Sequence, residues 1–89
     1  MLIRIKYGVS AMKKVKFTFP TDLIKEPLIY QLGQQFSLIT NIRRADVRPD
    51  IGWVVLEIEG TDEEIEVGLD WISQQGVRVD PVSGDIIEG

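Results

Sequence analysis

The order of apolar patterns along this chain, which switch between strand spacing and helix spacing, constrains its fold more than any other feature. Residues 14–19 alternate Val15, Phe17 and Phe19 with polar side chains, which predicts a strand with one buried face that ends at Pro20. Pro27 suits the first turn of a helix, where its missing N–H removes no hydrogen bond. The apolar residues of that helix share one face: Leu28, Ile29, Leu32 and Phe36.

The strand predicted over residues 38–47 changes its apolar phase midway. Leu38 and Ile42 have one parity, whereas Ala45 and Val47 have the other. A β-bulge near Arg43 and Arg44 would place both pairs on the same face. Turn residues follow, and the apolar side chains of the next strand then alternate regularly: Val54, Leu56 and Ile58.

A second helix is predicted from a capping box, in which Thr61 accepts a hydrogen bond from the backbone of Glu64. Gly76 suits the left-handed residue that ends this helix, and a last strand follows. The core stripe of the helix is Ile65, Leu69 and Ile72. The full order predicts an α+β fold of the ferredoxin-like β-α-β-β-α-β type, a four-stranded antiparallel sheet with two helices on one face.

One domain accounts for most of the 89 residues, 44% of which are hydrophobic. We expect it to span residues 12–82, because residues 8–11 read as a break before Met12. Residues 1–11 are then an N-terminal extension, which is either without fixed structure or an extra edge strand. Residues 83–89 form a C-terminal tail.

The chain has no cysteine and no histidine. It therefore supplies no thiolate for a metal or iron–sulfur cluster, and it lacks the commonest general base. The acidic residues around the second helix start have capping and dipole roles, without the spacing of a metal loop. We expect no catalytic residue, no metal site and no cofactor.

The formal net charge of −4 argues against attraction to nucleic acid or to an anionic membrane. No apolar run approaches the roughly 20 residues of a membrane helix, so no membrane insertion is expected. Charges interrupt the short apolar stretch at residues 1–7, unlike a secretion signal. These features predict a cytoplasmic protein.

A resemblance to a known family rests on residues 35–47 and 52–60, read as QFSLITNIRRADV and GWVVLEIEG. With the glycine before the second helix and the segment 76–79, they resemble an NIL domain over residues 13–81. Asn41 and Ile42 match the Asn-Ile-Leu triplet that names the family, whereas Arg43 replaces its leucine. The resemblance implies an ACT-like regulatory domain that pairs as a homodimer and binds methionine, as in methionine-importer ATPases. Other relatives precede an iron–sulfur ferredoxin segment, so the possible protein partners are a transporter or an iron–sulfur protein.

The resemblance implies ligand contacts at Asn41, Ile42 and Arg43. The Asn41 amide could donate to and accept from the polar ends of an amino acid, and it could equally bond its own backbone. Arg43 could pair with a carboxylate, although an exposed strand arginine is the simpler interpretation. A cation in place of leucine would also alter a pocket for an apolar side chain.

Trp53 and Val55 lie on the second face of their predicted strand and suggest a dimer interface, unless a terminus covers them. An RNA-binding sheet is an alternative, with Trp53 as a stacking platform. The acidic charge disfavours it, as does the core phase of Phe17 and Phe19. The remaining alternative is a module that docks on a protein partner without any ligand.

Overall fold

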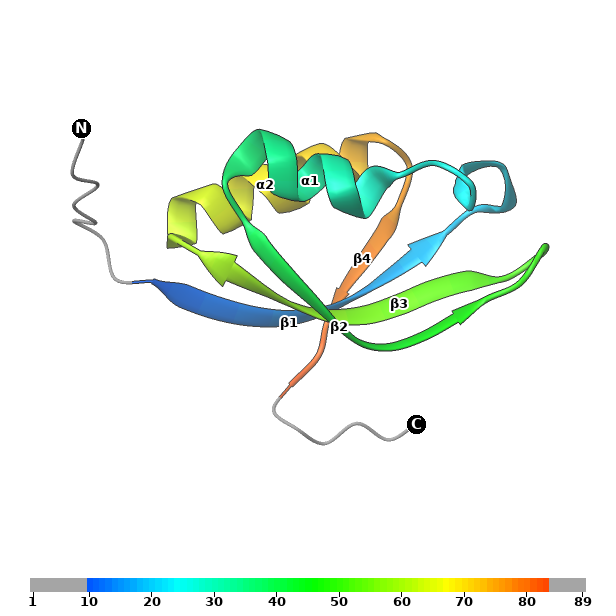
Figure 1. Ribbon diagram of the computed structural model, residues 1–89, viewed down its shortest axis with the longest axis horizontal. Coiled ribbons are helices and arrows are strands. Elements are labelled where there is room, and N and C mark those ends of the chain that lie inside the picture. Colours follow the sequence, from blue (N-terminus) through cyan, green and yellow to red (C-terminus); the bar gives the residue numbers. More distant parts are fainter. Residues whose placement is uncertain (1–9, 84–89) are drawn as a thin grey trace.

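Two helices lie over one face of an antiparallel sheet in the computed structural model, which describes residues 10–83 (Figure 1). Within this range the strand order is β2-β3-β1-β4. The arrangement confirms the predicted ferredoxin-like fold. Of the extension predicted at residues 1–11, residues 1–9 lie outside the described residues. Residues 84–89 of the predicted tail lie outside them too. The elements are β1 (Ala11–Phe19), a short 3-10 helix (Thr21–Leu23), α1 (Leu28–Phe36), β2 (Ile39–Val47), β3 (Gly52–Gly60), α2 (Asp62–Gln74) and β4 (Arg78–Pro81).

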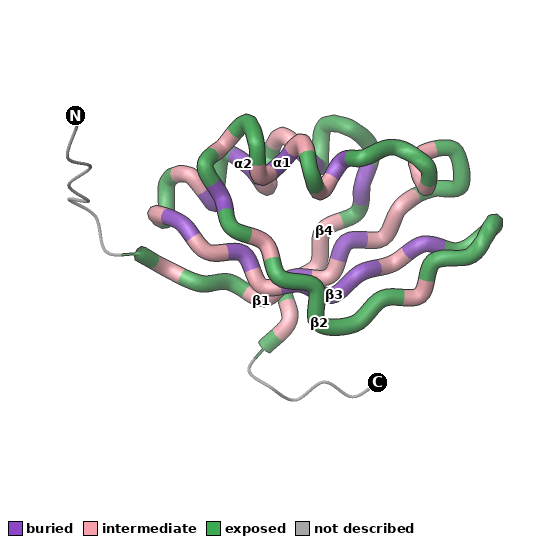
Figure 2. The backbone as a smooth tube through the Cα atoms, in the orientation of Figure 1, coloured by how far each residue is buried: buried purple, intermediate pink, exposed green. Residues whose placement is uncertain are grey.

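The core lies between the helices and the two central strands, β1 and β3 (Figure 2). Val15 pairs with Leu56 and Phe17 with Val54, so the apolar positions of both strands face the helices together. The predicted alternation is therefore confirmed. Fully or almost fully buried side chains come from four elements: Phe17, Leu32, Leu56, Ile58, Ile65 and Ile72.

The predicted bulge in β2 is present. Pairing with β3 passes from Ile42 opposite Leu56 to Arg44 opposite Val55, with a register shift between Ile42 and Arg44. The extra residue returns Ala45 to the face that Ile42 occupies. The two apolar pairs of this strand, which have opposite parity in the sequence, therefore face the same side of the sheet.

Local hydrogen bonds fix the ends of α2 as predicted. Thr61 accepts from the backbone N–H of Glu64 at 3.1 Å, and the Glu64 side chain accepts from the Thr61 N–H at 3.3 Å. At the other end Gly76 has φ of 106°, its N–H donates to Ser73, and the next N–H donates to Ile72. This pair of bonds is a Schellman motif.

The ends of α1 differ from the expectation. Pro27 is the N-cap residue that precedes α1, whereas the sequence predicted it inside the first turn of the helix. Its carbonyl oxygen accepts a hydrogen bond from Gln31 N–H at 3.1 Å. Ser37 ends the helix in the left-handed region, with φ of 56° and ψ of 43°. Nothing in the serine itself predicts that conformation, because glycine or asparagine is the usual residue there.

Leu38 is held between two glycines of different elements. A Cβ built on Gly60 would lie 2.6 Å from Leu38 Cδ2, and one on Gly68 would lie 2.7 Å from Leu38 Cδ1. Both distances are too short for real carbon contacts, so this leucine needs hydrogen at both sites. The contact fixes the start of β2 against α2. The rest of β2 has no such contact, and most of its residues are exposed.

Candidate ligand site along strand β2

Strand β2 forms one edge of the sheet, and the helices leave much of it exposed. It pairs with β3 on one side, and within residues 10–83 no strand pairs with its other side. Three of its apolar residues are highly exposed, namely Ile39 at 65%, Ile42 at 54% and Val47 at 58%. A bulge and three charged residues, Arg43, Arg44 and Asp46, protect this edge strand from pairing with other strands, although it also exposes apolar side chains.

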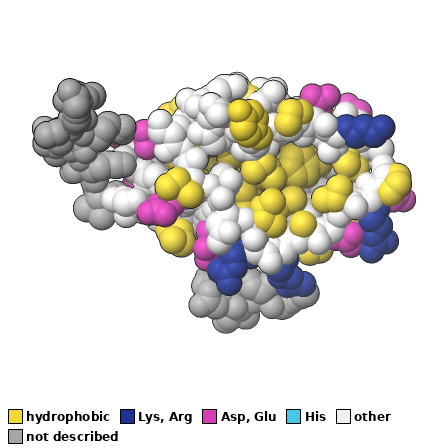
Figure 3. Space-filling view, viewed as in Figure 1, with side chains coloured by type: hydrophobic (Ala, Val, Ile, Leu, Met, Phe, Trp, Pro, Cys, Tyr) yellow, Lys and Arg dark blue, Asp and Glu magenta, His cyan; other side chains and the backbone are white. Residues whose placement is uncertain are grey.

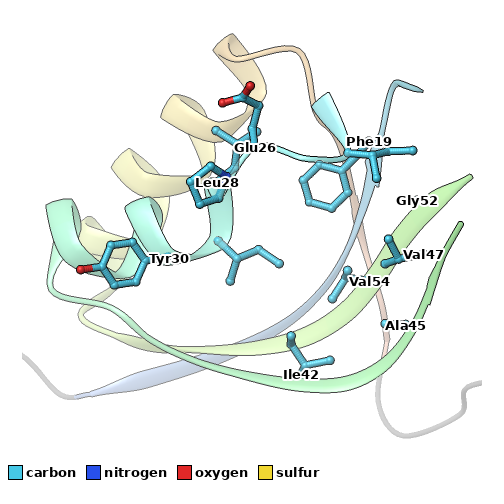
Figure 4. A pocket seen from close by; sticks show the side chains of 12 residues that line it. Phe19, Glu26, Leu28, Tyr30, Ile42, Ala45, Val47, Gly52 and Val54 are labelled. Atoms are coloured by element: carbon cyan, nitrogen blue, oxygen red, sulfur yellow. The ribbon is translucent and has the colours of Figure 1, made fainter. Parts of the chain in front are cut away.

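An apolar groove opens between this strand and the segment that enters α1. Figure 3 shows hydrophobic side chains gathered across a hollow there, and Figure 4 shows them from close by. The cavity has a volume of about 240 Å³. Its walls come from β1 to β3 and from residues 24–30: Phe19, Ile24, Glu26, Pro27, Leu28, Ile29, Tyr30, Ile42, Ala45, Val47, Gly52 and Val54.

A shallower and more polar hollow adjoins the groove along α1. The two share Ile29 and Tyr30, and the hollow is also lined by Gly33, Gln34, Ser37 and Thr40. Gln34 Nε2 donates to the Tyr30 hydroxyl oxygen at 3.0 Å. The hydroxyl hydrogen is then available to an acceptor, since a phenol both accepts and donates.

The predicted ligand residues divide between the two faces of β2. Ile42 lines the groove on the helix face. Asn41 lies opposite Glu57 on the other face, which we call the open face. Arg43 is on that face too, because its Nη1 atom bonds Glu57 Oε2 at 2.6 Å. The structure thus brings Asn41, Arg43 and Glu57 together and separates them from Ile42.

The open face is charged around its aromatic residue. Lys16 Nζ lies 5.1 Å from the centre of the Trp53 ring, and the Arg44 guanidinium carbon lies 5.9 Å from it. Val55 is on the same face but only 5% exposed, so it offers little surface to a second copy. Trp53 remains partly exposed.

At the hairpin, hydrogen bonding and charge attraction from Asp46 raise the pKa of Arg48 above its usual value.

The groove was not predicted from the sequence, although the apolar residues that β2 contributes to it were identified. The alternation of Ile42, Ala45 and Val47 is the signature of a core face, yet all three are exposed. The reason is that α1 is only nine residues long and leaves the hairpin end of β2 uncovered. No local pattern in the sequence indicates this, because it depends on how far α1 reaches over the sheet.

Among residues 10–83, the structure has no helix that is both long and apolar enough to cross a membrane. The solved structures include a similar fold, the C-terminal domain of an ABC transporter ATP-binding protein from Enterococcus faecalis. That match has a TM-score of 0.70 with 16% sequence identity, and it covers 82% of this chain and 86% of that one. At this identity the likeness shows the fold alone.

Sequence comparison is more specific. Methionine import ATP-binding protein MetN 1 of Enterococcus faecalis is 31% identical over 68 residues, which covers 72% of this chain and 19% of that protein. The chain therefore matches about a fifth of its relative's length. The model of the family described as NIL domain matches residues 13–81, most of the chain. This chain belongs to the NIL domain family.

Proposed function

We propose that this domain is a non-catalytic regulatory module that binds a small amino-acid-like ligand, with methionine as the first candidate. Two comparisons support the ligand class, namely the NIL family match and a relative whose name is that of a methionine import ATP-binding protein. The proposal places the domain in the cytoplasm, where it would modulate a transporter.

The observation that carries this proposal is the position of the NIL triplet. Asn41, Ile42 and Arg43 occur on an edge strand, where a ligand can reach either face without disturbing the core. One face offers polar groups at Asn41 and at the pair of Arg43 with Glu57. The other offers the apolar groove beside Ile42. These two faces are alternative sites, because the sheet lies between them and one amino acid can occupy only one of them.

A homodimer is part of the proposal. The predicted interface at Trp53 and Val55 provides limited apolar area, since only Trp53 is partly exposed. The β2 edge provides more, with the exposed Ile39 and an unpaired backbone within the described residues. Sedimentation velocity over a range of concentrations, with and without methionine, measures the dimer directly.

The second candidate function is a module that docks on a transporter or an iron–sulfur protein without a ligand. The observation in its favour is the open face, where Lys16 and Arg44 flank Trp53. Aromatic residues and arginine are enriched in protein interfaces. Under this alternative, substitution of Trp53 abolishes docking and no amino acid stabilises the domain.

A thermal-shift screen against amino acids and sulfur-containing analogues, followed by calorimetry on any hit, tests the proposal. A ligand that binds only the folded state stabilises it by about 2.7 kcal/mol at a concentration 100 times its Kd. We expect a saturable rise in Tm with methionine. A folded domain whose Tm no amino acid changes would contradict the sensor and favour the docking module.

A further inference from the structure

We propose that the helix layer carries a docking surface for a segment of another protein, one with apolar side chains between lysines or arginines. The inference goes beyond the proposed function and is independent of it, because no residue of β2 takes part. The surface, which we call the α2 ridge, combines three apolar residues with three acidic ones: Phe36, Val67, Trp71, Glu63, Glu66 and Asp70.

The apolar part of the ridge is continuous from α1 to α2. The ring centres of Phe36 and Trp71 lie 5.6 Å apart, and the rings are tilted by 51°. Val67, one helical turn before Trp71, is 56% exposed and lines a hollow of about 270 Å³ together with Phe36. Both aromatic rings pack partly against the core and remain partly exposed. Such a fixed apolar surface can receive an anchor side chain of a partner.

The negative charge of the molecule is concentrated in the same layer (Figure 1). Helix α2 has five carboxylates and neither lysine nor arginine, and α1 has no charged residue. The formal net charge of the chain is −4, so the residues outside α2 have a net charge of +1. The apolar part of the ridge therefore has a strongly acidic surrounding.

Two of these carboxylates have no role at the start of the helix. The acids at residues 62–64 lie in the first turn, where capping and the helix dipole account for them. Glu66 and Asp70 lie beyond that turn and one turn apart, a spacing at which like charges destabilise a helix. The bond that Asp70 accepts comes from Gln74 Nε2, a neutral donor, at 2.9 Å. A partner's cation beside Glu66 and Asp70 would relieve their repulsion.

The charge selects the class of partner. Nucleic acids and anionic membranes are repelled by an acidic surface. A second copy in an isologous contact would bring the same carboxylates opposite each other, which costs free energy. Among residues 10–83, no group of carboxylates could hold a metal ion. A protein segment with positive charge fits, since its cations pair with the carboxylates while an apolar side chain enters the hollow.

The spacing along α2 suits a partner that lies along the helix. Positions 63, 66, 67 and 70 are three or four residues apart, so their side chains form one face. The helix has 13 residues and is about 20 Å long. An amphipathic helix with apolar anchors at the same spacing is a recognised way to bind such a face.

Amide nitrogen–proton spectra of the full chain, titrated with synthetic peptides, test the proposal. The probe is an amphipathic helical peptide about as long as α2, with leucines on one face and lysines beside them. One control peptide has glutamates in place of the lysines, and the other has serines in place of the leucines. We expect the lysine–leucine peptide to shift the signals of Val67 and of the Trp71 indole N–H saturably, and both controls to bind at least about tenfold more weakly. Affinity should also fall between about 0.1 M and about 1 M salt, because the Debye length falls from about 10 Å to about 3 Å.

Matched substitutions locate the contact. Glu66→Lys reverses a charge on the ridge and should weaken binding of the lysine–leucine peptide roughly five- to tenfold. The variant should stay folded, since its lysine can pair with Asp62 and Asp70 on the same helix. Glu26→Lys makes the same change at an exposed residue before α1, away from the ridge, and should alter the affinity less than about twofold. Val67→Ser leaves the charge unchanged and should weaken binding about fivefold through the lost apolar contact.

Several results would overturn the docking surface. Equal losses in Glu66→Lys and Glu26→Lys would reveal only a general attraction between opposite charges. Tight binding of the glutamate peptide, shifts centred on Trp53 of the open face, or no shift at Val67 and Trp71 would also contradict it. Shifts of these two signals on dilution of the chain alone would place a second copy on the ridge instead. Methionine binding is measured separately, so failure of this inference leaves the proposed function standing.

Discussion

Arg43 and Glu57 are joined across the two strands of the β2–β3 hairpin, with Arg43 Nη1 at 2.6 Å from Glu57 Oε2. The arginine is the bulged residue, and its side chain is 47% exposed, against 20% for the glutamate. The pair satisfies, within one chain, the charge that replaces the family's leucine. Because the arginine is also about half exposed to solvent, this position of the strand accepts a charge in place of the leucine.

Restoration of the leucine tests this explanation. Arg43→Leu should change the free energy of unfolding by about 1 kcal/mol or less, because ion pairs this exposed contribute little. The affinity for methionine shows which face of β2 binds the ligand, since Arg43 lies on the open face and the groove on the other. Urea unfolding and calorimetry measure the two quantities, and a tenfold change in affinity would show that the open face takes part in binding.

The packing of Leu38 predicts an unequal response of two helical glycines to alanine. A Cβ on Gly68 would lie 2.7 Å from Leu38 Cδ1 and 3.1 Å from Leu32 Cδ1. Overpacking costs about 1–3 kcal/mol and exceeds the gain of about 1 kcal/mol in helix propensity. We expect Gly68→Ala to lower the free energy of unfolding by about 1–2 kcal/mol, measured in urea.

Gly33→Ala is the matched control in α1, where the nearest atom to the added carbon is Leu38 O at 3.2 Å. The milder contact and the propensity gain should nearly cancel. A double-mutant cycle adds a sharper criterion, because Leu38→Ala removes the δ carbons that the new methyl meets. If Gly68→Ala is equally damaging in both backgrounds, the clash with Leu38 is not its cause.

The capping box makes a separate contribution. Thr61→Ala removes the oxygen that accepts from Glu64 N–H, and it should lower stability by about 1 kcal/mol, within a range of 0.5–2. Ser73→Ala, exposed near the end of the same helix, is the control and should be neutral or slightly stabilising. If both alanine variants change the free energy of unfolding equally, the capping hydrogen bond makes no net contribution to stability.

Gly76 should be intolerant of any side chain. Its φ of 106° is a conformation that L residues rarely adopt, and an added Cβ would lie 3.3 Å from Leu23 Cδ1. Gly76→Ala should therefore destabilise the domain by about 1–2 kcal/mol, as seen in the midpoint of thermal or urea unfolding. Ser37→Gly is the converse test, since it should relieve strain at the left-handed end of α1. A loss of stability there would show that the serine is not strained.

Most of the fold follows from local patterns in the sequence. The alternation of Phe17 with polar neighbours, the box of Thr61 with Glu64, and the left-handed Gly76 each have one dominant structural solution, and the structure adopts it. The bulge in β2 was predictable too, because only an extra residue returns Ala45 to the face of Ile42. These signals act within a few residues.

The groove and the close packing of Leu38 were not predictable, since they depend on distances between elements. Periodicity shows that Ile42 and Val47 face the helix layer, but not that α1 fails to reach them. Likewise, Gly60 and Gly68 are separated by eight positions in sequence, and only the folded chain shows that one leucine lies between them. The separation of Asn41 and Ile42 by the sheet, in contrast, follows from the alternation of side chains along a strand.

Backbone amide chemical shifts during a titration of the unmodified domain with methionine test the central claim most directly. The account predicts saturable shifts concentrated on strand β2, around Asn41 and Ile42. Residues of β4, at the opposite edge of the sheet, should move little. A spectrum that methionine leaves unchanged at millimolar concentration would contradict the account.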